Sequence, residues 1–232
     1  MFICRSERLY YARCTVTKWK TILLFRLLLT LYSLSTLVAP MAHAQQSQLM
    51  DAVEVNQAVN VIDGLHVALA NLMMSDETEL TARKALIGPA LNAAFDMEAM
   101  SKAIIGSKAW RTANDDERNQ AIAAFNDWMI TQYASRFSKS QSPKFSTRET
   151  RDGGLNTIVV ETVLRTKKRL VNLDYRMRKA GSDVKIIDVF LDGRVSEVAL
   201  RNSEYRKLIR EAGLQGFVSS LKEKTASLAG TS

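Results

Sequence analysis

The feature that most constrains the fold of this chain is a change in the periodicity of its apolar residues after Pro143. Before this residue, apolar side chains recur every three or four positions, which is the period of an amphipathic α-helix. After it, β-branched and other apolar side chains alternate with polar ones through four consecutive segments, which is the pattern of β-strands. Because strands joined by short turns pair as antiparallel hairpins, the sequence predicts a set of helices followed by a β-meander.

Helical periodicity is strongest in three segments of the first part of the chain, and capping patterns mark where helices begin. Asp76 with Glu79 forms a capping-box pattern ahead of a further helix, which the Gly88-Pro89 pair is expected to bend or end. Asn114 with Glu117 forms a second such pattern, directly before an amphipathic stripe that includes aromatic residues. The three predicted segments are residues 47–74, 96–105 and 115–137.

The alternating part of the chain predicts four strands joined by turns. Asp152-Gly153-Gly154 is the first predicted turn, and Asp192-Gly193 ends the meander. Helical spacing then returns from about Ser203, with Gly213 as the expected C-cap. The predicted strands are residues 145–150, 155–166, 171–178 and 184–191. This order predicts an α+β fold, a single domain in which helices pack on a curved antiparallel sheet of about four strands.

Residues 1–44 have the layout of a secretory signal peptide. Basic side chains precede or interrupt an apolar run over residues 22–39, which ends in Pro40-Met41 and the small-residue triplet Ala42-His43-Ala44. A retained membrane anchor is the alternative, but Arg26 leaves only 13 uncharged residues, 27–39, whereas a spanning helix needs about 20. We therefore expect cleavage after Ala44, which leaves residues 45–232 as the mature domain.

The formal charge of +8 suggests a nucleic-acid partner, but its distribution argues against one. Of the 32 basic and 24 acidic side chains, six and one lie in residues 1–44, so the mature domain carries only +3. Cys4 and Cys14 lie in the same segment, and His66 is the one histidine of the mature domain. This composition excludes cysteine nucleophiles, Cys/His zinc sites and thiol redox chemistry. It predicts no cofactor and no metal, and it is compatible with an oxidising compartment such as the periplasm.

Few residues of the mature domain offer catalytic chemistry. His66 lies among apolar neighbours without a Cys or His partner, which is more typical of a packed or surface histidine than of a general base. Asp174, Tyr175 and Asp188 on neighbouring strands could imitate an isomerase pocket, but Asp174 alternates with the apolar face and is expected to be solvated. By alternation along the predicted strand, Asp188 lies on the same face as apolar residues such as Phe190. A structural hydrogen bond or an ion pair best explains a carboxylate on that face.

The run Arg165, Lys167, Lys168 and Arg169 lies at a turn between two predicted strands. A solvated hairpin explains it, and in an exported protein it could also meet an anionic lipid headgroup, an acidic partner surface or an anionic membrane. The sequence contains no GxGxxG, P-loop, HExxH or GxSxG pattern. We therefore predict that the protein is not an enzyme. An apolar space between a curved sheet and its helices is the alternative to catalysis, because such spaces bind ligands.

Two long stretches of the chain resemble a known family. Their matching pieces are, in order, Phe95-Asp96, Gly106, Trp110, the helix over 125–133, Leu173-Asp174-Tyr175-Arg176, Asp188-Val189, Gly193, Ser196, Ser203-Glu204-Tyr205 and Gly213-Leu214. In this order they resemble the MlaC or toluene-tolerance family of periplasmic lipid carriers, over about residues 50–225. Val184 stands where many members have Trp, and the motif DGRVSEVALRNSEY is similar to the subgroup associated with hopanoid transport.

The resemblance implies a function and a set of partners. It implies a soluble periplasmic shuttle that serves an Mla-type ABC lipid transport system and maintains outer-membrane lipid asymmetry. Its partners would be an outer-membrane lipoprotein complex and an inner-membrane complex of a permease, an ATPase and an MCE-domain protein. The acyl chains of the cargo, phospholipid or hopanoid, would lie between the sheet and the helices. We expect no nucleic-acid partner and a monomer.

A carrier must enclose the apolar part of its lipid, because exposing a 16-carbon chain to water costs on the order of 12 kcal/mol. The alternation of side chains along the predicted strands and the apolar stripe of the helix over residues 115–137 select the side chains that we expect to contact lipid. These are Phe125, Met129, Tyr133, Ile158, Val160, Leu164, Val171, Leu173, Tyr175, Met177, Ile186 and Phe190. Core packing is the competing role for each, and a shift of one residue in register would exchange the two faces. An enzyme for an apolar substrate, with Asp188 or His66 as base, and an adaptor that docks proteins around a solid core remain alternatives.

Overall fold

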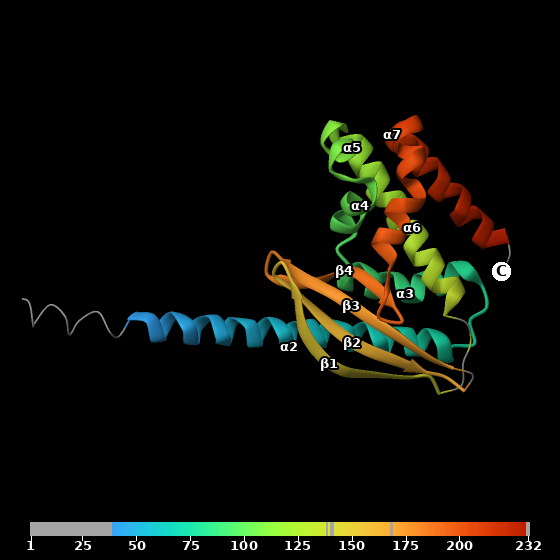
Figure 1. The fold of residues 1–232 in the computed structure, drawn as a ribbon. Helices are drawn as coiled ribbons and strands as arrows, with labels where there is room; N and C mark the ends of the chain where they lie inside the picture. Colours follow the sequence, from blue (N-terminus) through green and yellow to red (C-terminus); the bar gives the residue numbers. More distant parts are fainter. Residues whose placement is uncertain (1–38, 138, 140–141, 168, 231–232) are drawn as a thin grey trace, which may run out of the picture. The chain divides into compact units, whose positions relative to one another are not determined.

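Five antiparallel strands form one sheet in the order β1-β2-β3-β4-β5, so each strand pairs with its neighbours in the chain (Figure 1). The computed structural model describes residues 39–137, 139, 142–167 and 169–230, with side chains from Ala52 onward. The predicted signal peptide lies outside these residues, except that residues 39–44 begin helix α2 (Ala39–Met74). The chain divides into two compact units, Met1–Met50 and Asp51–Ser232, and the second unit contains the whole sheet.

Among the remaining helices, those over residues 97–105 and 115–136 begin where their sequence signals predict. The capping box predicted at Asn114 and Glu117 is confirmed, because each side chain accepts a hydrogen bond from the other residue's backbone N–H at 2.9 Å. Asp96 caps the helix over residues 97–105, because its side chain accepts a hydrogen bond from the N–H of Ala99 at 2.9 Å. No helix among the described residues is long and apolar enough to cross a membrane. The helices are α3 (Leu80–Ala94), α4 (Met97–Ile105), α5 (Ser107–Thr112), α6 (Asp115–Arg136) and α7 (Glu197–Gly230).

For α3, the capping prediction is wrong, and the helix end that was one of the two effects expected of Gly88-Pro89 is not seen. The capping box expected from Asp76 and Glu79 does not form, because Glu77 Oε1 accepts from the backbone N–H groups of Thr78 and Glu79 instead. The Gly88-Pro89 pair does not end the helix, which continues to Ala94. Ile87 and Leu91 on either side of the proline are fully buried, so tertiary packing offsets the hydrogen bond that proline removes.

Helix α7 begins at Glu197, earlier than the predicted start near residue 203. The two strands that precede it supply the caps: Asp188 Oδ1 accepts from the N–H of Val198 at 3.1 Å, and Ser196 Oγ accepts from the N–H of Ala199 at 2.9 Å. Gly213, the predicted C-cap, is a kink within the helix, with φ 62° and ψ −161°. This conformation is accessible to glycine at little cost and separates two helical segments.

At the first hairpin, β1 is longer than predicted and β2 begins two residues later than predicted. Leu155 and Asn156, both with positive φ, make the two-residue turn, and the expected turn residues Asp152-Gly153-Gly154 belong to β1. Gly153 is required there, because a Cβ would lie 2.4 Å from Oγ1 of Thr157. The strands are β1 (Lys144–Gly154), β2 (Thr157–Arg165), β3 (Leu170–Ala180), β4 (Asp183–Leu191) and the two-residue β5 (Val195–Ser196), which the sequence analysis missed.

A β-bulge in β4 changes which face its side chains occupy. Arg176 of β3 pairs with Asp188, whereas the next residue, Met177, pairs with Ile186. Ile187 is therefore an extra residue on β4 that opposes no residue of its own on β3. Beyond the bulge, each side chain of β4 lies on the face opposite to the one that simple alternation predicts.

The bulge corrects the prediction for the end of β4. Val189 pairs with Tyr175 and joins the apolar inner face of the sheet. Asp188 and Phe190 move to the outer face, where the guanidinium carbon of Arg176 lies 5.1 Å from the centre of the Phe190 ring. The predicted position of Phe190 among the residues of the inner face is thus wrong, because sequence parity does not detect one inserted residue.

The helices cover the inner face and the β4 side of the sheet (Figure 1). Within Asp51–Ser232, α2 lies along the inner face, where Lys179 of β3 forms an ion pair with Glu54 at 3.0 Å. Helix α6 packs against α3 and α7, and α3, α4 and α7 contact β4. The hydrophobic core fills the space between these helices and the inner face. The predicted α+β fold, with helices on an antiparallel sheet, is confirmed.

Candidate functional site

A cavity of about 860 Å³ lies between helix α6 and the inner face of the sheet. Its floor and walls come from α2, α4, α6, β2, β3 and β4, and its other residues come from the turns at one end of the sheet and the start of α7. The lining residues are Met73, Met100, Trp128, Met129, Gln132, Tyr133, Arg136, Phe137, Lys139, Leu164, Thr166, Lys167, Arg169, Val171, Leu173, Val189, Leu191, Asp192 and Glu197.

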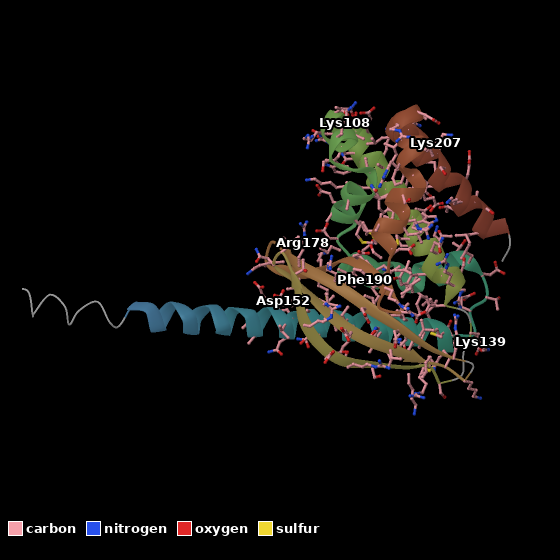
Figure 2. All side chains as sticks on the ribbon, viewed as in Figure 1. Lys108, Lys139, Asp152, Arg178, Phe190 and Lys207 are labelled. Carbon is pink, nitrogen blue, oxygen red and sulfur yellow. The ribbon has the colours of Figure 1, made fainter. Side chains whose placement is uncertain are left out.

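Burial divides the lining residues into an apolar interior and a polar mouth. The buried ones are almost all apolar: Met73, Met100, Trp128, Met129, Leu164, Leu173 and Val189. The exposed ones are mostly charged: Arg136, Lys139, Lys167, Arg169, Leu191 and Asp192. Since exposed side chains can line a cavity only where it meets solvent, the cavity opens at the end of the sheet that carries the β2–β3 turn. Figure 2 shows Lys139 at this end and Asp152 toward the other.

Aromatic side chains of α6 form one wall of the cavity. Tyr133 and Phe137 are four residues apart, so they lie on one helix face, and their rings stack at a centroid distance of 5.3 Å. Phe95 contacts Tyr133 edge-on at 5.8 Å. Burial and the nearby carboxylate of Glu197 raise the pKa of the Tyr133 phenol, so this side chain is neutral and can donate a hydrogen bond into the cavity.

The acidic residue at the cavity wall is neutralised by an arginine. Glu197 Oε1 accepts hydrogen bonds from Arg201 Nε at 2.8 Å and from Nη2 at 2.6 Å. The same guanidinium lies 4.8 Å from the centre of the Trp128 ring and bonds to Glu204 through Nη1 at 2.7 Å. Glu197 therefore adds little net negative charge to the wall.

Cations predominate among the charged residues at the mouth. Arg136, Lys139, Lys167 and Arg169 line it, together with the acidic Asp192. Lys139 also forms an ion pair with Asp76. A cavity with a basic mouth and an apolar interior can hold a molecule that has one anionic end and an apolar remainder.

Arg83 holds the backbone beside the mouth, although it does not line the cavity. This buried side chain donates from Nε to the carbonyl of Ala134 at 2.9 Å and from Nη2 to that of Phe137 at 2.7 Å. Its Nη1 donates to the carbonyls of Glu77 at 3.0 Å and Leu72 at 3.4 Å. The arginine thus joins the C-terminal ends of α2 and α6, where a cation is favoured by the helix dipoles. A lone Arg in an amphipathic helix carries no sequence signal for this role.

Five of the twelve residues predicted to contact lipid line the cavity: Met129, Tyr133, Leu164, Val171 and Leu173. They come from α6, β2 and β3, the elements on which the helical stripe and the strand parity were based. The structure brings their side chains together at one end of the sheet. The lipid contact itself stays a prediction for each of them.

The other seven predicted residues do not line the cavity. Phe125, Val160, Tyr175, Met177 and Ile186 are buried in the core, Ile158 packs against it, and Phe190 lies on the outer face. The strand residues among the first six belong to the part of the sheet away from the mouth. Parity predicts the face of a side chain, but it cannot predict where along a strand the two layers separate.

Sequence reasoning also missed lining residues. Trp128 of α6 was not among the residues selected from the helical stripe, and simple alternation along β4 does not select Val189 because it does not detect the bulge. Met73 and Met100 lie on helices whose apolar faces give no indication of the cavity. The basic turn over residues 165–169 was a visible signal, and its Lys167 and Arg169 lie at the mouth.

His66 is a packed residue, which decides between the packed and surface positions that its sequence context left open. It is buried, its ring stacks on Phe145 at 4.3 Å, and its Nε2 lies 3.3 Å from the hydroxyl of Tyr175. Burial lowers the pKa of His66 to about 4. It does not line the cavity, so nothing in this geometry brings a substrate to it.

The two strand aspartates have structural surroundings. Asp188 accepts hydrogen bonds from the backbone of Val189 at 2.8 Å and from Ser196 Oγ at 2.6 Å, in addition to capping α7. Asp174 was expected to be solvated, but it is buried, with only 8% of its surface exposed. Burial, together with the nearby Glu161, raises its pKa. Neither aspartate lines the cavity.

No group of three or more His, Cys, Asp or Glu side chains is placed to hold a metal ion in the part of the chain that the structure describes. What this site offers chemically is shape and charge: an enclosed apolar space, a neutral phenol, and cations at the opening. The arrangement suits binding of an amphipathic anion.

Comparison with known proteins identifies a shared fold and a family. A solved structure similar to this chain is the phospholipid-binding protein from Ralstonia solanacearum in complex with a phospholipid, with a TM-score of 0.64 and 19% sequence identity. The match covers 75% of this chain and 97% of that one, and it shows that the two share a fold. No curated protein matches the sequence.

The fold and the site define an α+β protein built around an apolar cavity that opens at one end of its sheet. The family model described as MlaC protein matches residues 60–223, which is well over half of the chain. The chain belongs to the MlaC family.

Proposed function

We propose that this protein is a periplasmic phospholipid carrier, which holds acyl chains in the cavity and the headgroup at the mouth. The observation that carries the proposal is the division of the cavity into a buried apolar interior and an exposed, mainly basic mouth. A phospholipid has the complementary division into apolar tails and an anionic phosphate. The volume of about 860 Å³ falls within the range of small-molecule sites, about 300–1,000 Å³.

Energetics favour an enclosed tail. Each buried CH₂ group contributes about 0.8 kcal/mol, so a 16-carbon chain in water is disfavoured by on the order of 12 kcal/mol. Met129, Leu164, Val171 and Leu173 would surround such a chain, while Tyr133 could donate a hydrogen bond to an ester oxygen. Arg136 and Arg169 would meet the phosphate, because guanidinium groups bind phosphate oxygens with charge-assisted hydrogen bonds.

Family membership supports the wider role. We infer that residues 1–44 are removed as a signal peptide, that residues 45–232 form the carrier, and that it works in the periplasm. The carrier would exchange lipid with an outer-membrane lipoprotein complex and with an inner-membrane ABC transporter that contains an MCE-domain protein. The bound phospholipid of the similar Ralstonia solanacearum protein supports a phospholipid cargo over a hopanoid.

The alternatives are less well supported. The adaptor hypothesis requires a solid core, and this core contains a cavity of about 860 Å³. The enzyme hypothesis requires His66 or Asp188 to reach a substrate, and neither lines the cavity. A binding protein that performs no catalysis is the function that the geometry supports best.

The test is the content of the cavity. The protein is purified from the envelope of cells that express the full chain, extracted with organic solvent and analysed by mass spectrometry. Phospholipid at about one molecule per chain is the expected result. A hopanoid at the same ratio would change the cargo, and a protein that is empty and takes up no added lipid would refute the carrier.

A further inference from the structure

Methionine is concentrated on the helical wall of the cavity. Met73 of α2, Met100 of α4 and Met129 of α6 line it, and each exposes 4% or less of its surface. Among the residues that the structure describes, Trp128 is the other buried side chain that the helices contribute to the lining. Methionine accounts for nine of the 232 residues of the chain but for three of these four, so the helical wall is far richer in it than the protein as a whole.

The other buried lining residues have less freedom to change shape. Leu164, Leu173 and Val189 belong to strands that are hydrogen-bonded to a neighbouring strand on both sides, so the sheet fixes their backbone. Valine is also restricted at its first side-chain torsion by branching at Cβ. The Trp128 ring is large, has only two rotatable bonds and packs under the guanidinium of Arg201 at 4.8 Å. These side chains therefore give the cavity a constant outline.

Methionine differs from these side chains in flexibility. It is unbranched, with three rotatable bonds and a polarisable thioether, so it fits irregular neighbours and is common at surfaces that bind several different partners. Leucine has a similar volume but is branched, and exchange between the two in a core is usually tolerated. A wall of methionines can therefore follow the contour of a bound chain, whereas a wall of leucines would keep one contour.

We propose that Met73, Met100 and Met129 form an adaptable wall, which lets the cavity accept phospholipids with bent, cis-unsaturated tails as well as those with straight tails. The inference rests on the proposed carrier function and adds the class of tail that the carrier accepts. A saturated or trans-unsaturated tail can extend along a rigid wall. A cis double bond does not rotate and holds a permanent bend, so the wall has to adapt to the tail. In a closely packed interior, a wall that could not adapt would penalise the bent tail.

The experiment compares two lipids that contain the same atoms. Dioleoyl- and dielaidoyl-phosphatidylglycerol have the same headgroup and the same tail length, and they differ only in the cis or trans geometry of the double bond. Protein purified from cells that express the full chain is exchanged with an excess of both lipids, in equal parts, in detergent micelles. Gel filtration then removes the micelles, and gas chromatography of the released fatty acids separates and quantifies the cis and trans chains.

The decisive variant combines Met73→Leu, Met100→Leu and Met129→Leu. The wild-type protein should hold cis and trans tails in nearly equal amounts. The triple variant should hold about ten-fold less of the cis tail, which corresponds to about 1.4 kcal/mol and lies within the usual cost of a shape mismatch in a packed core. The matched control is Met97→Leu, because Met97 is buried on the same helix as Met100 but does not line the cavity. The control should give the wild-type ratio.

A single substitution provides the test if the triple variant does not fold, which circular dichroism shows. Met129→Leu alone should lower the share of the cis tail by about two-fold, if the three methionines contribute equally and additively. An exchange of one methionine for leucine in a core is well tolerated, so this variant is expected to fold.

The two lipids together separate this inference from the carrier function. An unchanged ratio in the substituted protein would overturn the adaptable wall, and so would an equal loss of both lipids or the same shift in Met97→Leu. A wild-type protein that binds the trans lipid but excludes the cis lipid would also overturn it, while the carrier function would stand. A wild-type protein that binds neither lipid would refute the carrier function and this inference with it.

Discussion

Replacement of Arg83 by methionine should destabilise the protein by several kcal/mol, far more than replacement of its neighbour Lys84. Arg83 is buried and donates four hydrogen bonds to carbonyls at the ends of α2 and α6 and in the loop between α2 and α3. Methionine has similar bulk but no donor, so these carbonyls lose their partners. Lys84 lies on the same helix and forms a half-exposed ion pair with Asp127 at 2.6 Å.

The magnitude follows from burial and the number of bonds. Hydrogen bonds to a charged group are each worth about 1.5–3 kcal/mol, and disruption of a buried charged network typically costs about 3–5 kcal/mol in all, because water reaches some of the freed groups. Domains are usually stable by about 5–15 kcal/mol, so this is a large fraction. At about 2–4 °C per kcal/mol for a domain of this size, Tm should fall by roughly 10 °C. Exposed ion pairs contribute about 0–1 kcal/mol, so Lys84→Met should have little effect.

Urea unfolding, followed by circular dichroism at neutral pH, measures both variants against the wild type. Arg83→Lys provides a third point, because an ammonium keeps the charge but cannot span the same carbonyls, and its free energy of unfolding should lie between the other two. A loss below about 1 kcal/mol for Arg83→Met, or equal losses for the methionine variants at 83 and 84, would refute the assigned role of this arginine.

Three further outcomes are expected. Leu173→Trp should fill part of the cavity and lower the amount of lipid that co-purifies, measured by mass spectrometry, whereas Val195→Trp on the exposed β5 should not; equal lipid content in both would contradict the assigned cavity. The folded pKa of His66 is about 4, against about 6.5 unfolded, so the unfolded state takes up the proton first. Stability should therefore be complete above pH 6.5 and fall by about 3 kcal/mol as the pH drops to 4, and His66→Phe should lack this component in urea titrations at each pH. Asp188→Ala should cost about 2 kcal/mol in the same assay, through the lost cap of α7, and a loss under about 0.5 kcal/mol would argue against that cap.

Sequence signals predicted helix starts and strand order well where these depend on interactions between residues close together in the chain. The capping box at Asn114 and Glu117 forms within four residues, so its outcome depends little on the rest of the chain. The strand pattern predicted the order of the meander, because neighbouring segments joined by short turns have few other ways to pair. The basic run over residues 165–169 likewise marked a turn, two of whose residues lie at the mouth.

The sequence was less informative where one element depends on another. Gly88-Pro89 was expected to bend or end the helix, but burial of Ile87 and Leu91 keeps α3 continuous through Pro89. The bulge at Ile187 moved Phe190 away from the inner face and brought Val189 onto it. Nothing in the local pattern of β4 identifies the inserted residue, since its presence is defined only by pairing with β3.

The sequence by itself therefore determined the class of fold, the order of the strands and the absence of common catalytic motifs, because periodicity and composition are local properties. Tertiary structure alone decided where the cavity lies, which five of the twelve predicted residues line it, and how Arg83 holds its rim. A cavity is a place where two layers separate, and that separation depends on the sizes and positions of side chains from helices and strands far apart in the chain.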